Sequence, residues 1–137
     1  MNIIMLPPWS LALLSVIYVA LDAVNFKVLA PNLYKSFYKE GIVDNRAAAA
    51  IYILYPLSIV FLTRAPTAME AVHRGLVLGL TGYGLYHATN MATLKDWAKM
   101  PTQVMAWDTV WGGIVTSLIA YVAFRLGNSV VPKTRMG

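Results

Sequence analysis

Residues 102–124 have the sequence TQVMAWDTVWGGIVTSLIAYVAF, and this stretch decides the fold. Pro101 precedes it, Arg125 follows it, and Asp108 is the single charged residue within it. A helix needs about 20 mostly apolar residues to cross a bilayer core of about 30 Å. The stretch therefore predicts a transmembrane helix.

The rest of the chain has the same character. Of the 137 residues, 58% are hydrophobic and 12% are charged, about half the charged share of an ordinary soluble domain. Lipid can cover that much apolar surface, whereas a soluble core of this size cannot. We predict an all-α integral membrane protein in which residues 1–137 form a single transmembrane domain.

Four apolar runs are bounded by charged residues and prolines, and they predict spans at about residues 9–29, 46–63, 75–92 and 102–124. The first run lacks the basic leader and the small-residue cleavage site of a signal peptide, so we expect it to remain in the protein as a helix. Pro56 should kink the second span or free a carbonyl, and residues 64–74 form a short polar connection. Four spans form a bundle with both termini on one side, here called the terminal side; the other is the loop side.

The loop-side connection at residues 32–41 combines charged and aromatic residues. Leu33, Phe37 and Tyr38 fall at helical spacing, which predicts a short amphipathic helix in the membrane interface. Several aromatic residues outside the spans are interpreted as an interfacial belt: Tyr34, Tyr38 and Trp97.

The net charge of +5 does not indicate nucleic-acid binding. The basic residues flank the apolar runs instead of forming one stripe, which is typical of membrane anchoring. Apart from Lys27, which lies within the first run, they divide five against five between the two sides, so they favour neither orientation. The chain contains no cysteine, which excludes disulfides, thiolate metal sites and cysteine nucleophiles.

Three acidic or histidine residues lie deep inside the predicted spans, where an ionised side chain costs about 2.5–3.5 kcal/mol at the bilayer centre. Asp22, His87 and Asp108 are each six or seven residues from the loop-side end of a span, which places them about 10 Å below that surface. Other polar and aromatic residues share their helix faces at three- and four-residue spacing. The candidate cluster is Asp22, Asn25, Tyr52, Tyr55, Tyr83, His87, Asn90, Asp108 and Trp111.

Such a cluster has several interpretations. Its residues can simply fasten helices together by hydrogen bonds, form a pocket for a proton, ion or small substrate, or contact a partner subunit. A metal site at Asp22, His87 and Asp108 has suitable ligand types but no short ligand motif. Haem ligation by His73 and His87 would need a second histidine-bearing helix. We assign no catalytic residue, cofactor or metal, and expect bound phospholipid as the one candidate ligand.

Small residues predict close helix contacts. Gly75 and Gly79 form a small-xxx-small pair, and Gly112 and Gly113 lie in the middle of the last span. We expect these faces to meet another helix, including helices of other chains.

Several motifs occur in order along the chain. They are Asp22 with Asn25, the segment Ile51–Tyr55, the segment Tyr86–Asn90, the segment Ala92–Trp97 and the segment Asp108–Gly112. In this order they resemble DUF2177, a family of small bacterial membrane proteins of unknown function. The family usually has Trp where Asn25 stands and Asp where His87 stands. The resemblance implies a four-helix membrane fold and no established chemistry.

We expect a structural or accessory subunit of a larger membrane complex, for example a respiratory or ATP-synthase complex, rather than an enzyme. Its partners would be the lipid bilayer and other membrane subunits. The alternative is a stand-alone protein with an Asp/His pocket for proton or ion movement or for a small or lipid substrate. We expect the protein in a bacterial or mitochondrial inner membrane.

Overall fold

The computed structural model describes residues 6–35, 45–93, 95 and 101–130. Every regular element within these residues is a helix. In chain order they are α1 (Pro8–Val24), the π-helix η1 (Asn25–Leu29), α2 (Pro31–Lys35), α3 (Asn45–Leu62), α4 (Ala68–Thr93) and α5 (Thr102–Val130). The all-helical fold is the predicted one.

Three of these helices are long and apolar enough to cross a membrane: Pro8–Leu29, Asn45–Leu62 and Thr102–Asn128. The first two nearly coincide with the predicted spans. Although α4 has 26 residues, it contains glycines, threonines and His87 instead of a continuous apolar run, and it is not among the three. The predicted span at residues 75–92 therefore stays a prediction, as do the membrane sides of the termini.

Two helices are longer than the sequence predicted. Helix α4 begins at Ala68 instead of Gly75, because the Thr67 hydroxyl accepts a hydrogen bond from the Glu70 N–H at 3.2 Å. Thr67 and Glu70 have the spacing of a capping box, a helix-start signal that the prediction missed. Helix α5 continues beyond Arg125, whose guanidinium lies over the Tyr121 ring and donates to its hydroxyl at 2.9 Å. Arg125 ends the apolar run in the sequence, but the helix continues past it.

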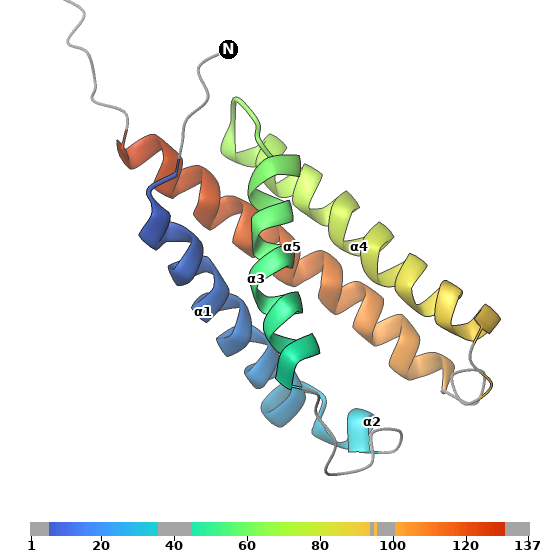
Figure 1. Cartoon of the computed structure of the whole chain (residues 1–137). Helices are drawn as coiled ribbons and strands as arrows, with labels where there is room; N and C mark the ends of the chain where they lie inside the picture. Colours follow the sequence, from blue (N-terminus) through green and yellow to red (C-terminus); the bar gives the residue numbers. More distant parts are fainter. Residues whose placement is uncertain (1–5, 36–44, 94, 96–100, 131–137) are drawn as a thin grey trace, which may run out of the picture.

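Helix α5 is central to the arrangement. Helix α4 runs antiparallel beside it along most of its length, and α1 and α3 pack on it as well (Figure 1). The apolar core lies toward the end where α1 begins and α5 ends. It includes Leu14, Ile59, Val115, Ile119 and Ala120, all almost completely buried.

Four glycines bring the backbones of α4 and α5 together, and we call them the glycine seam: Gly75, Gly79, Gly112 and Gly113. A Cβ atom on Gly79 would overlap the carbonyl group of Gly112, and one on Gly75 would lie 2.8 Å from the Ser117 Cα. The small residues thus permit a close helix approach, as predicted. The expectation that they face other chains is wrong, because α4 and α5 use these faces for each other.

The first span ends in a local irregularity. Its last turn is the π-helix η1, and Ala30 then adopts φ −136° and ψ 42° before α2 begins. Helix α2 packs on η1 and α5 (Figure 1). It is the described part of the predicted interfacial helix; Phe37, Tyr38 and Trp97 lie outside the described residues.

Candidate functional site

Polar and aromatic side chains from the four long helices, η1 and α2 meet toward the end of the bundle where α1 ends and α5 begins. They come from the C-terminal halves of α1 and α4, the first and middle turns of α3 and the N-terminal half of α5, with one each from η1 and α2 (Figure 1). We call this group the polar layer. It consists of Tyr18, Asp22, Asn25, Tyr34, Tyr52, Tyr55, Tyr83, His87, Trp107, Asp108 and Trp111.

The Asp22 carboxylate joins three helices. Its Oδ1 accepts a hydrogen bond from the Trp111 Nε1–H of α5 at 2.9 Å, and its Oδ2 accepts one from the Tyr52 hydroxyl of α3 at 3.1 Å. Asp22 is 8% exposed. A buried carboxylate needs hydrogen-bond donors around it, and here both donors are neutral aromatic groups.

The second carboxylate forms a pair with an imidazole. His87 Nε2 of α4 and Asp108 Oδ2 of α5 lie 2.7 Å apart, and both side chains are largely buried. One proton is held between these two atoms, on the nitrogen or on the oxygen according to the protonation state of the pair. A buried Asp–His pair can therefore take up or release a proton while it stays hydrogen-bonded.

The other Asp108 oxygen connects the pair to α1 and α2. Its Oδ1 accepts a hydrogen bond from the Tyr34 hydroxyl at 2.8 Å, and that hydroxyl accepts one from Asn25 Nδ2 at 3.0 Å. Asn25 Oδ1 in turn accepts one from the Trp107 Nε1–H at 2.9 Å. Asn25 is completely buried, and its amide group fixes the orientation of the Tyr34 hydroxyl and the Trp107 indole.

Four tyrosines extend the layer toward the middle of the bundle. The hydroxyls of Tyr18 and Tyr83 are hydrogen-bonded to each other, and the Tyr55 hydroxyl is 2.9 Å from Thr116 Oγ1. The Tyr18 ring lies against those of Tyr52 and Tyr55, with centroids 5.3 and 5.6 Å apart. These contacts hold the hydroxyls at fixed positions in the interior.

The polar groups of the described residues are well partnered. No buried side-chain nitrogen or oxygen within them is left without a hydrogen bond. Within the same residues, no three acidic or histidine side chains come together as ligands of one ion. Asp22 accordingly bonds to aromatic donors rather than sharing an ion with His87 and Asp108.

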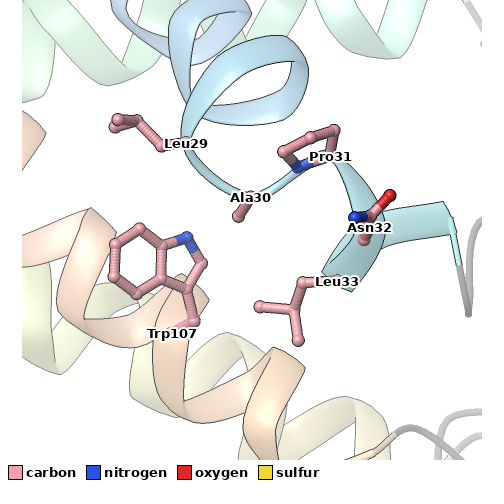
Figure 2. Close-up of a pocket in the computed structure, with 6 residues that line it drawn as sticks. All are labelled: Leu29, Ala30, Pro31, Asn32, Leu33 and Trp107. Carbon is pink, nitrogen blue, oxygen red and sulfur yellow. The ribbon is translucent and has the colours of Figure 1, made fainter.

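An open pocket lies beside the layer. Its volume is about 320 Å³, and its walls come from the junction of η1 and α2 and from α5: Leu29, Ala30, Pro31, Asn32, Leu33 and Trp107. Figure 2 shows the Trp107 indole on one side and Leu33 and Pro31 on the other. The pocket is mainly apolar, and Trp107 links it to Asn25 and hence to the Asp108 connection.

The structure brings most of the predicted cluster together. Asn90 is the exception, because its side chain hydrogen-bonds with Tyr86 instead of a residue of the layer. Tyr34 was interpreted as an interfacial residue; this is wrong, since it is 5% exposed and bonded to Asn25 and Asp108.

Two further members were missed, Tyr18 and Trp107. Tyr18 precedes Asp22 by four residues, and Trp107 precedes Trp111 by four. The same helical spacing that identified the other members would have found both. Tyr34 carried no such signal, because α2 is a separate element that folds back onto α5.

A comparison with protein families gives one match. The family model described as predicted membrane protein (DUF2177) matches residues 9–125, which include every residue of the layer. No curated protein and no solved structure matches the chain significantly.

Proposed function

We propose that the chain, which belongs to the DUF2177 family of predicted membrane proteins, binds a small or lipid substrate at the polar layer and exchanges a proton with it at the His87–Asp108 pair. The substrate reaches the layer from the loop side. The observation that carries this proposal is the 2.7 Å contact of His87 Nε2 with Asp108 Oδ2 between two buried helix faces. Ionisable residues within membrane segments are costly and commonly mark functional sites.

The distribution of polar groups supports access from one side. Asp22 is about 10 Å from the Leu29 end of the first span and about 20 Å from the Pro8 end, at 1.5 Å per residue. Beyond Thr116 the interior is filled by apolar side chains such as Leu14, Ile59 and Ile119, all fully buried. A proton path through the whole bundle would have to cross this packed region. A site open at one end requires no such path.

The charges of the layer also support proton exchange. The layer contains two carboxyl groups, Asp22 and Asp108, and no lysine or arginine lies beside either of them among its described residues. A second negative charge in such a place is costly. Binding a proton, or a substrate that donates one, lowers that cost.

The proposal can be tested by profiling compounds in reconstituted membranes. Purified protein is placed in liposomes of total bacterial membrane lipid with an aqueous metabolite extract, and lipids and soluble compounds are followed by mass spectrometry. We expect at least one compound to be consumed or retained by the wild type. Asp108→Asn and His87→Gln should slow this process by about 100-fold, the usual contribution of an acid–base group.

His73→Gln is the matched control, because His73 is an exposed histidine of the same helix. Unchanged profiles for the wild type, Asp108→Asn and His87→Gln would contradict the proposal. Pyranine-loaded liposomes give an independent check. A proton flux across the membrane that Asp108→Asn abolishes would show a through path and overturn the one-sided site.

The accessory-subunit function has less support from the geometry. The glycine faces expected to contact partners are used within the chain, and the remaining outward side chains, such as Phe61 and Val77, suit lipid as well as protein. This function, and a bacterial or mitochondrial inner membrane as its location, stay predictions. Other membrane subunits that co-purify with the wild type after mild detergent extraction, but not with Asp108→Asn, would favour the accessory-subunit function.

A further inference from the structure

We propose that the ligand recognised at the polar layer is an amphipathic alcohol, whose hydroxyl group replaces that of Tyr34 between Asn25 and Asp108. This inference rests on the proposed function and names its substrate class. It starts from the unusual origin of Tyr34. The other members of the layer belong to the long helices or to the π-helical turn that ends the first span, whereas Tyr34 is supplied by the separate five-residue helix α2.

The surroundings of the Tyr34 hydroxyl define what can replace it. The hydroxyl donates to Asp108 Oδ1 at 2.8 Å and accepts from Asn25 Nδ2 at 3.0 Å. When the hydroxyl leaves, a carboxylate acceptor and an amide donor remain, both desolvated. A hydroxyl is the simple group that satisfies both at once. A carboxylate or phosphate ligand would place a second negative charge against Asp108, and an ester oxygen could not donate to it.

The surroundings beyond the hydroxyl are apolar. The Tyr34 ring packs edge-on against Phe26, with centroids 4.5 Å apart, and against the fully buried Val104. The pocket of about 320 Å³ adjoins this place and is lined by Leu29, Leu33 and Trp107 among others (Figure 2). A molecule with one hydroxyl and an apolar body therefore matches both parts. Such molecules are held in the bilayer, and its loop-side leaflet would supply them to the layer.

The backbone around α2 allows Tyr34 to leave. Helix α2 follows the π-helix η1 and the irregular Ala30, and π-helical turns occur frequently at functional sites. Among the described elements, it packs on η1 and α5. A movement of this short helix exposes Asp108 without separating α4 from α5. The Tyr34 hydroxyl thus competes with the ligand for Asn25 and Asp108. The ligand affinity therefore depends on the fraction of molecules in which Tyr34 is displaced.

The test uses oleyl alcohol, with oleyl methyl ether as the probe that lacks the donor hydroxyl. The full chain is placed in phosphatidylcholine nanodiscs, and the Trp107 indole N–H signal is followed by ¹H–¹⁵N NMR. We expect a saturable shift with the alcohol and none with the ether. Tyr34→Phe should bind the alcohol about tenfold more tightly, because the loss of the competing hydroxyl removes hydrogen bonds of that order.

Tyr34→Ala, which also removes the ring, should bind at least as tightly as Tyr34→Phe, and Asp108→Asn should lose the preference for the alcohol. Tyr121→Phe removes a hydroxyl at the opposite end and serves as the matched control. Equal shifts with alcohol and ether, or no effect of either Tyr34 variant, would overturn the inference. That failure is distinct from failure of the proposed function, in which Asp108→Asn leaves every compound profile unchanged.

Discussion

The glycine seam and the polar layer hold the same helices together by opposite means. In the seam, α4 and α5 approach until backbone meets backbone, and no side chain fits between Gly79 and Gly112. In the layer, the helices are joined by the tips of long side chains, as in the contact of Trp111 with Asp22 at 2.9 Å. The seam is therefore sensitive to volume, and the layer to hydrogen-bonding groups.

This difference separates the structural part of the molecule from the candidate functional part. A seam without space for a side chain has no space for a ligand. The layer contains exchangeable hydrogen bonds, an Asp–His pair and a neighbouring pocket. Substitutions that change only volume, or only hydrogen bonding, should affect the two regions differently.

The largest effect is expected for Gly79→Ala. The added methyl group would overlap the Gly112 backbone, so α4 and α5 must move apart. Overpacking of this kind costs about 1–3 kcal/mol, and we expect the upper end because backbone cannot move aside. Thermal unfolding in detergent, followed by circular dichroism, measures the loss.

Gly82→Ala is the matched control in the same helix. There the new methyl group would meet only the Tyr55 hydroxyl, at 3.6 Å, which is an ordinary contact. Replacing glycine in a helix even favours folding by up to about 1 kcal/mol. If the two variants unfold at the same temperature, α4 and α5 are not joined by the seam.

A smaller effect is expected in the layer for Asp22→Ala. The Trp111 and Tyr52 donors would lose their acceptor inside the bundle. The buried Trp111 N–H, left unpaired, costs about 1–3 kcal/mol, and the Tyr52 hydroxyl adds little because its hydrogen bond is only partly buried. Asp22→Asn retains an oxygen for Trp111 and offers an N–H group to the Tyr52 hydroxyl, so it should cost less than about 1 kcal/mol. The same unfolding experiment compares them.

Equally large losses of stability in Asp22→Ala and Asp22→Asn would show that the layer requires the negative charge of Asp22 itself. Similar small losses would show that neither donor depends on Asp22. In both cases the distinction between a volume-sensitive seam and a layer sensitive to hydrogen bonding would fail.

The sequence was sufficient for the parts of the fold that follow from helical period. Runs of apolar residues located the helices, and the distance from the span ends, at about 1.5 Å per residue, placed Asp22, His87 and Asp108 at one level. The pairing of the seam could not be predicted, because the glycines at residues 75 and 79 specify a close approach without specifying the partner helix.

The position of Tyr34 in the layer could not be predicted from the sequence either. Its position in the layer depends on the π-helical turn and on Ala30, which redirect the chain so that α2 packs on α5. A five-residue helix carries too few positions for a periodic pattern. Interpretation of Tyr34 as an interfacial aromatic followed a general tendency, which the local backbone geometry overrode.

The smallest expected effect concerns the deep edge of the layer, where it meets the apolar core. The Tyr55 hydroxyl and Thr116 Oγ1, 2.9 Å apart, join α3 to α5. Tyr55→Phe and Thr116→Val nearly preserve side-chain shape, so a double-mutant cycle should isolate the hydrogen bond. We expect a coupling energy of about 0.6 kcal/mol, the average for interhelical hydrogen bonds in membranes.

Ser58→Ala supplies the reference for this cycle, because Ser58 donates to the Leu54 carbonyl of its own helix at 2.8 Å and should show no coupling to Thr116. A coupling near zero for Tyr55 with Thr116 would mean that the polar layer ends before Thr116 and that Thr116 belongs to the apolar core. A coupling above about 2 kcal/mol would exceed any single bond of this type and would mean that the tyrosine group acts as one cooperative network. The polar layer would then contribute to folding as strongly as the seam, and hydrogen bonding and volume would no longer divide the two regions.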